Sequence, residues 1–251
     1  MAFGVLPLFV SEVLFTAYNN SSFSGKAIVW ILLACSVAAW TVMVTKFSQI
    51  KAARVHSEHF LRAFRAERLP GGLITKKMTF PQSPLYLLYE AGIKTMHSEL
   101  ALNGMRSEDL YSGALNEGEF RRLTPPQLET IRIVMDRTMA DEALFLESRM
   151  GLLATSVSVA PFIGLLGTVL GVLEVFSGIG QAGAMVIAAV APGISSALLT
   201  TVIGLLVALP STIGYNMLAA RIRELNVQMD NFIQEFGSAV QHLYSVYGAE
   251  E

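Results

Sequence analysis

The chain has 251 residues, of which 53% are apolar and 15% are charged, and its formal net charge is −2. This composition, together with a positive mean hydropathy, is typical of a membrane protein that also has a substantial aqueous part. The charge is close to neutral and no basic cluster is interleaved with aromatic residues, which argues against nucleic-acid binding.

Residues 1–27 are predicted to be an N-terminal external or interfacial segment. They are apolar in short pieces that Glu12 interrupts, and the polar run YNNSSFSGK follows. A secretory signal carries positive charge directly before its apolar core, and this start has none. The segment is therefore expected to lie on the membrane surface, with an ordered tail as the alternative.

Residues 28–45 are the first predicted transmembrane helix. Trp30 and Trp40 lie toward its two ends, where aromatic residues meet the membrane interfaces. Six basic residues occur within 46–68, against Lys26 alone just before the helix. The positive-inside rule therefore places the N-terminus outside the cell and the chain from residue 46 in the cytoplasm.

Residues 46–150 are predicted to form a helical cytoplasmic region. The first transmembrane helix is expected to continue as a charged helix to about Glu67. Ser83 followed by Pro84 has the form of an N-cap and a first helical residue, and predicts a helix that reaches about Leu102.

A second start signal in this region is Thr124 with Gln127 three residues later. Ile131 and Met135 then lie on one apolar face. We expect this helix to lead directly into the second transmembrane helix, and we predict a weaker helix at 107–117.

The stretch between Arg149 and Arg221 contains a single formally charged residue, Glu174. It is too long for one membrane crossing, because the hydrocarbon core takes about 20 helical residues. The turn is predicted in SGIGQAG (177–183), where three glycines interrupt the apolar run. The predicted parts are transmembrane helix 2 at 151–180, transmembrane helix 3 at 184–215 and a cytoplasmic helical tail at 216–251.

Small residues recur at helical spacing on both predicted helices of this hairpin. Helices in lipid associate through close backbone approach over small residues and through hydrogen bonds. The residues assigned to helix packing are Gly164, Gly167, Gly171, Ala197, Gly204, Ala208, Pro161 and Pro192. One hairpin and one further helix are not expected to cover both small-residue faces, so a homo-oligomer is predicted.

The segments APFIGLLGTVLGV (160–172) and VAPGISSALLTTVIGLLVALPSTIGYN (190–216) resemble the paired signature of the TolQ/ExbB/MotA family, which consists of ion-channel subunits of bacterial inner-membrane motors. The resemblance extends to SVAAWTVMVTKF (36–47), SPLYLLYEAGIK (83–94) and MDNFIQEF (229–236), and the last of these favours the TolQ branch.

This resemblance implies an all-α protein of the bacterial inner membrane with three transmembrane helices, its N-terminus outside and its C-terminus inside. It also implies a homopentamer around a dimer of single-span TolR/ExbD-like subunits, each carrying an aspartate. Protons or sodium ions flowing between the two would power work on the cell envelope. The alternative is a non-conducting membrane scaffold of the same architecture.

Thr168 and Thr201 align with the threonines that line the ion path in the family, and Thr155 is a third candidate. A hydroxyl both donates and accepts, so it can relay hydrogen bonds without the cost of a buried charge. The alternative is that each hydroxyl bonds a carbonyl of its own helix, four residues back.

The chain departs from its relatives at one position. Where the TolQ and ExbB branches commonly read APGIAEAL, residues 191–198 read APGISSAL, so Ser196 replaces an intramembrane glutamate. Either the essential carboxylate is the aspartate of the partner subunit, or Glu174 supplies it from the other helix. Glu174 can also lie at the pore mouth, where it reaches interfacial water.

The sequence contains no phosphate-binding loop, no GxSxG motif and no cysteine cluster. His56 and His59 have metal-ligand spacing but belong to a charged helix, so a solvated face is the preferred interpretation. No enzyme activity, cofactor or metal is therefore expected. A transmembrane ion gradient is the energy source that suits polar groups at membrane depth.

Overall fold

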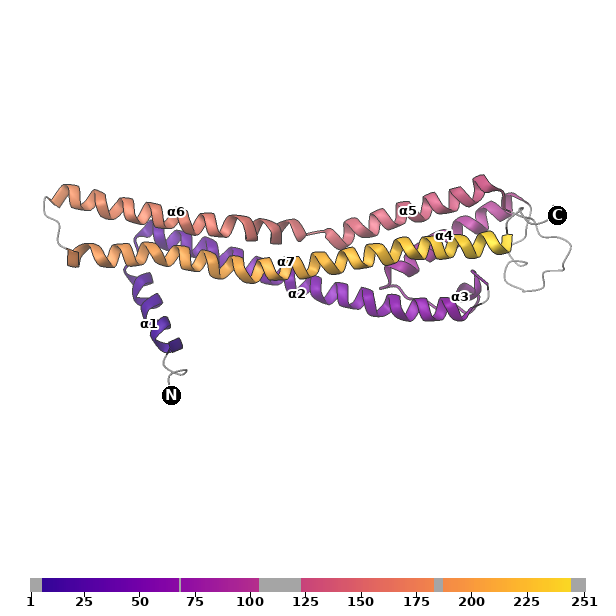
Figure 1. The fold of residues 1–251 in the computed structure, drawn as a ribbon, viewed down its shortest axis with the longest axis horizontal. Helices are drawn as coiled ribbons and strands as arrows, with labels where there is room; N and C mark the ends of the chain where they lie inside the picture. The colour runs from indigo at the N-terminus through magenta and orange to yellow at the C-terminus, as the bar shows by residue number, and fades with distance from the viewer. Residues whose placement is uncertain (1–5, 68, 104–122, 183–186, 245–251) are drawn as a thin grey trace. The chain divides into compact units, whose positions relative to one another are not determined.

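The computed structural model describes residues 6–67, 69–103, 123–182 and 187–244. Within these ranges the chain forms seven α-helices and no strand, as Figure 1 shows, so the predicted all-α class is confirmed for them. Three helices are long and apolar enough to cross a membrane: α2 (Phe23–Ala66), α6 (Met150–Ala182) and α7 (Ile187–Tyr244).

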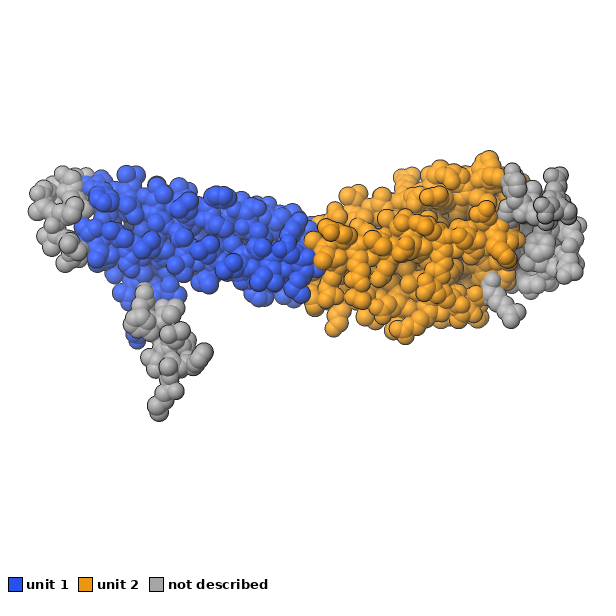
Figure 2. All heavy atoms as spheres, in the orientation of Figure 1, with its two compact units in different colours: residues 1–45, 149–217 blue, residues 46–148, 218–251 orange. Residues whose placement is uncertain are grey.

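The chain divides into two compact units, coloured separately in Figure 2. The first unit comprises residues 1–45 and 149–217, and the second comprises residues 46–148 and 218–251. Helices α2 and α7 each contribute residues to both units.

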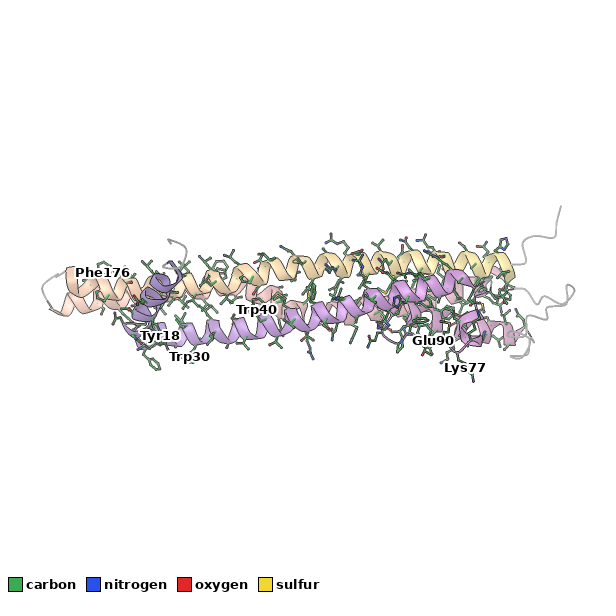
Figure 3. All side chains as sticks on the ribbon, turned by 90° about the horizontal axis from the view of Figure 1, so that it is seen from below. Tyr18, Trp30, Trp40, Lys77, Glu90 and Phe176 are labelled. Atoms are coloured by element: carbon green, nitrogen blue, oxygen red, sulfur yellow. The ribbon has the colours of Figure 1, made fainter. Side chains whose placement is uncertain are left out.

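The first unit holds helix α1 (Leu6–Asn19), the start of α2, α6 and the start of α7. Its small core joins Leu32 of α2 to Ala160 of α6 and Ala208 of α7. Trp30 and Trp40 of α2 are instead 61% and 52% exposed (Figure 3). An apolar exterior around a small core is the surface that lipid requires.

The second unit holds the rest of α2, helix α3 (Gly72–Thr75), α4 (Pro84–Leu102), α5 (Pro125–Glu147) and the rest of α7. Its core is a cluster of aromatic rings with centroids 5.3 to 6.3 Å apart, several of them edge to face. The cluster consists of Phe60, Phe64, Phe80, Tyr86, Tyr89, Phe232 and Phe236. These large rings give the second unit a larger hydrophobic core than the small one of the first unit.

Two helix starts in the second unit follow the predicted capping chemistry. The Ser83 hydroxyl accepts a hydrogen bond from the Tyr86 amide at 3.2 Å, and α4 begins at Pro84. The Thr124 amide donates to the Gln127 side chain at 3.0 Å, which is one half of a capping box. Both sequence predictions are confirmed.

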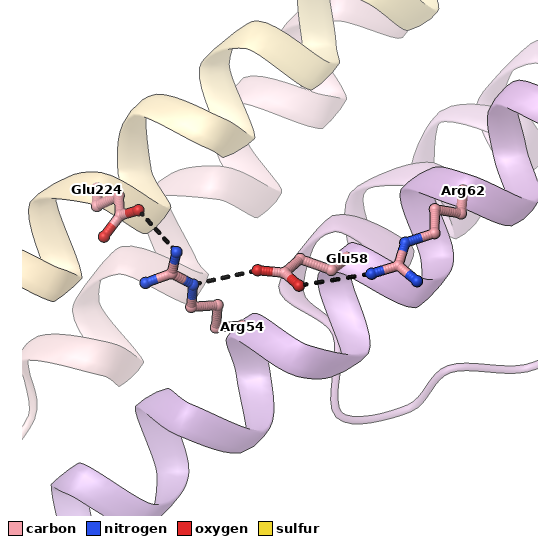
Figure 4. A network of polar contacts seen from close by, with 4 residues as sticks. All are labelled: Arg54, Glu58, Arg62 and Glu224. Carbon is pink, nitrogen blue, oxygen red and sulfur yellow. Dashed lines mark hydrogen bonds and ion pairs between the residues drawn. The ribbon is translucent and has the colours of Figure 1, made fainter.

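Ion pairs join α2 to α7 on the surface of the second unit. Arg54 contacts both Glu58 and Glu224, and Arg62 contacts Glu58 (Figure 4). Arg65 and Glu235 form a bidentate salt bridge with both N···O distances at 2.8 Å. Because these groups are largely exposed, each pair contributes only modestly to stability.

The prediction that the helix after Thr124 leads directly into the second transmembrane helix is wrong. Helix α5 ends at Glu147 and α6 begins at Met150. Between them Ser148 has extended backbone, and Arg149 has a φ of 65°, in the left-handed region.

The physical reason is a set of side-chain hydrogen bonds at the end of α5. The ammonium of Lys46, which is 3% exposed, lies 3.1 Å from the Phe145 carbonyl and 3.0 Å from the Ser148 hydroxyl. The Ser148 hydroxyl also donates to the Phe145 carbonyl at 2.7 Å. These bonds satisfy groups that a continuing helix would have used, so the helix ends.

The turn predicted at 177–183 overlaps helix in the structure. Helix α6 continues through Ala182, since a glycine weakens a helix by about 1 kcal/mol but does not prevent it. The remainder of the connection, residues 183–186, and the helix predicted at 107–117 lie outside the described residues.

Candidate functional site

Helices α6 and α7 come into backbone contact at Gly164 and Gly204. A Cβ atom added to Gly164 would lie 2.7 Å from the Thr200 carbonyl oxygen and 3.2 Å from the Gly204 Cα. One added to Gly204 would lie 2.7 Å from the Ala160 carbonyl oxygen. Only glycine fits at these two positions without displacing backbone.

The contact continues along both helices. A Cβ on Gly167 would lie 2.5 Å from the Thr200 hydroxyl, and one on Gly171 would lie 2.7 Å from the Ala197 Cβ. The small-residue faces therefore cover each other within one chain. This corrects the argument that they require a second chain, because helical spacing identifies a packing face but not its partner.

Three threonines form a hydroxyl cluster at this contact: Thr168 on α6, and Thr200 and Thr201 on α7. The Thr168 and Thr201 hydroxyls are hydrogen-bonded to each other. The Thr200 hydroxyl lies 2.9 Å from the Gly164 carbonyl and 2.7 Å from the Ala197 carbonyl. Thr168 and Thr201 were predicted from the sequence, whereas Thr200 was not, although it directly precedes Thr201 in a Thr-Thr pair.

The Thr168–Thr201 pair admits two directions of hydrogen bonding. Thr168 lies 3.3 Å from the Ala197 carbonyl, and Thr201 lies 3.2 Å from the Gly164 carbonyl. Each hydroxyl has one proton, so Thr201 can donate to Thr168 while Thr168 donates to Ala197. Alternatively Thr168 donates to Thr201 while Thr201 donates to Gly164. The same heavy-atom positions serve both arrangements, as a hydrogen-bond relay requires.

Other candidate residues bond their own helix. The exposed Thr155 hydroxyl donates to the Gly151 carbonyl at 2.8 Å, and the buried Ser196 hydroxyl donates to the Gly193 carbonyl at 2.8 Å. Neither joins the hydroxyl cluster. Among the predicted packing prolines, Pro161 is half-buried within α6 and Pro192 is exposed on α7.

Glu174 is held by the first turn of α2. The Ser24 hydroxyl donates to Glu174 Oε1 at 2.5 Å and lies 2.8 Å from the Ser22 hydroxyl. Ser22 in turn accepts from the Gly25 amide at 3.3 Å, the geometry of an N-cap. A carboxylate beside a helix N-terminus is favoured by the helix dipole. We call Ser22, Ser24 and Glu174 the serine clasp.

The serine clasp lies apart from the hydroxyl cluster. Glu174 follows Thr168 by six residues on α6, which is about 9 Å along a helix. Ser22 and Ser24 were not predicted as site residues, although the run SSFSGK before an apolar helix is a recognisable N-cap signal. Within the described ranges no three His, Cys, Asp or Glu side chains are grouped as a metal ion requires.

Comparison with known proteins adds a family match. Residues 94–231 match the MotA/TolQ/ExbB proton channel family. The Tol-Pal system protein TolQ of Haemophilus influenzae is 28% identical over 223 residues, which cover 87% of this chain and 90% of the relative. TolQ of Pseudomonas aeruginosa is 29% identical, covering 89% and 90%. The biopolymer transport protein ExbB of Neisseria meningitidis is 30% identical, covering 80% and 84%.

The backbone contact predicts a difference between two glycines of α6. Gly164→Ala should lower the thermal midpoint of the protein in detergent, because its Cβ meets α7 backbone and overpacking of this kind costs about 1–3 kcal/mol. The control is Gly178→Ala, whose Cβ meets no atom within 4 Å. Equal midpoints for the two variants would contradict the contact.

The serine clasp predicts coupling between two side chains. Glu174→Ala and Ser24→Ala should each lower the thermal midpoint, and the double variant should lose less than the sum, since each single change already breaks the shared bond. Gradient-driven activity should survive Glu174→Gln. Additive losses would show that the bond does not contribute, and loss of activity without unfolding would place an essential carboxylate in this chain.

Proposed function

The chain belongs to the MotA/TolQ/ExbB proton channel family, and on that basis we propose that it is an ion-conducting subunit of a motor in the bacterial inner membrane. Its relatives include a Tol-Pal system protein and a biopolymer transport protein, and neither name denotes an enzyme. The observation that carries the proposal is the hydroxyl cluster, which places a reversible hydrogen-bond pair on two of the candidate membrane helices.

The proposed ion path runs past Thr168 and Thr201, with Thr155 and Ser196 as further polar groups along it. The cluster is neutral, so it can hydrogen-bond to water or coordinate a cation through its oxygens, but it cannot itself take up and release a proton near neutral pH. A titrating carboxylate must then come from elsewhere. Glu174 is engaged in the serine clasp, which favours a carboxylate on a partner subunit.

We propose that this partner is a dimer of single-span TolR/ExbD-like subunits, each with an aspartate facing the cluster, inside a homopentamer of this chain. The ion is a proton or sodium. Its passage between the aspartate and the threonines would move the partner relative to the ring, and so convert the ion gradient into mechanical work on the cell envelope.

The proposed topology has the N-terminus outside and the C-terminus in the cytoplasm. Segment 1–27 lies outside or at the interface, and the transmembrane helices occupy 28–45, 151–180 and 184–215. Residues 46–150 and 216–251 are cytoplasmic. The six basic residues within 46–68 support this orientation.

A non-conducting membrane scaffold is the second candidate function. Two features favour it: Ser196 stands where the resemblance to the TolQ and ExbB branches implies a glutamate, and every hydroxyl of the cluster has a partner within the same chain. Hydroxyls of that kind can serve helix packing alone. The two candidates differ in whether function depends on those hydroxyls and on the ion gradient.

The topology can be tested with reporter fusions. A reporter placed after residue 75 or at residue 251 should be cytoplasmic, because basic residues flank the predicted transmembrane helices on that side, among them Lys46, Arg149 and Arg221. A reporter inserted near Gly180 should be external. Cytoplasmic activity of the Gly180 insertion would contradict the hairpin arrangement.

The ion path can be tested by removing single hydroxyls. Thr201→Val and Thr168→Val should each abolish gradient-driven activity while assembly, followed by size-exclusion chromatography, stays intact, because valine keeps the shape of threonine but cannot hydrogen-bond.

The matched control is Thr212→Val, which removes a hydroxyl bonded only within α7, to the Ala208 carbonyl at 2.8 Å. Its activity should be unchanged. If Thr168→Val and Thr201→Val assemble and work at the wild-type rate, the hydroxyls serve only packing and the scaffold function is favoured.

A further inference from the structure

The second unit contains a groove that the proposed ion path does not use. Its volume is about 540 Å³, within the range of roughly 300–1,000 Å³ that small-molecule sites occupy. The groove lies between α2, the segment before α4, α4 and α5. Its apolar wall includes Ala53, Pro84, Leu87 and Leu146.

Polar side chains from three different segments also line the groove: Ser48 and Gln49 on α2, Gln82 before α4, and Glu142 on α5. None of the four is hydrogen-bonded to another described side chain. Glu142 is the one formally charged residue among those that line the groove. The site therefore combines one carboxyl with neutral groups that can accept hydrogen bonds.

The Glu142 carboxyl is poorly accommodated without a partner. Burial raises its pKa above the ordinary value, and the neighbouring Asp141 raises it further. No lysine or arginine is among the described lining residues, and the ammonium of Lys46 binds the end of α5. A positive charge brought to Glu142 would favour the ionised carboxylate and so oppose the raised pKa.

We propose that this groove binds a small organic cation, a primary ammonium carried on an apolar body. An ammonium has three donors, which match one carboxylate and two of the neutral oxygens of Ser48, Gln49 and Gln82. The apolar body would lie against Leu87 and Leu146. The size of the groove favours a free small molecule over an extended segment of protein. This site is independent of the proposed ion path.

The test uses the full chain in lipid nanodiscs, with phenethylamine as the probe and empty nanodiscs as the blank in calorimetric titration. Phenethylamine should bind, and 2-phenylethanol, which has nearly the same shape but no charge, should bind at least about tenfold more weakly. Equal binding of the two compounds, or no binding of phenethylamine, would overturn the proposal.

Substitutions locate the site. Glu142→Gln should weaken phenethylamine binding by about tenfold or more without lowering the thermal midpoint, because the amide keeps the shape but not the charge. Glu147→Gln, an exposed carboxyl on the same helix that does not line the groove, is the matched control and should bind normally. Equal loss in both variants would indicate surface attraction only and overturn the proposal.

Two further outcomes bear on the assignment. Ala52→Leu fills part of the groove and should abolish binding, so unchanged affinity would place the ligand elsewhere. The peptide acetyl-Leu-Lys-Leu-amide carries the same ammonium on a protein backbone. If it binds more tightly than phenethylamine and loses that affinity in Glu142→Gln, the groove is a docking site for a protein segment, and the small-cation proposal is wrong.

Discussion

The membrane part of this protein depends on the backbone contact between α6 and α7 at Gly164 and Gly204. Lipid tails are as apolar as leucine, so burying leucine between two helices gains little free energy in a membrane. Close backbone approach and hydrogen bonding must therefore hold the helices together. At this contact any side chain larger than hydrogen would meet main-chain atoms at 2.7 Å. The same closeness brings the threonine hydroxyls within reach of carbonyls on the facing helix, so packing and polar chemistry have one cause.

Because the hydroxyl cluster is neutral, the proposed mechanism needs a titrating group from a second subunit. A carboxylate at membrane depth is costly, and this chain carries Ser196 at the position where the family resemblance implies one. Its remaining charged residue in the hairpin, Glu174, is bound by Ser24 at the first turn of α2. The chain would thus supply a path of hydroxyls, and the partner would supply the group that titrates.

Local signals in the sequence predicted much of this structure. The helix starts at Pro84 and Pro125 follow from capping residues next to prolines, and the three long helices follow from apolar length. Contacts between residues far apart in the chain could not be predicted from these local signals. Lys46 and Ser148, which end α5, are 102 residues apart, and Ser24 and Glu174 are 150 apart. Helical spacing likewise identified the small-residue faces without showing that they pair with each other.

Access of water to the hydroxyl pair tests the central claim most directly. In a Cys35→Ala background, Thr201→Cys and Leu206→Cys can be exposed in membranes to a water-soluble cationic thiol reagent, which reacts only with a hydrated thiolate. Leu206, 57% exposed, lies on a different side of α7 from Thr201 and is the reference. An ion path past Thr201 predicts modification of Thr201→Cys and none of Leu206→Cys. A Thr201→Cys thiol as unreactive as the reference would contradict it.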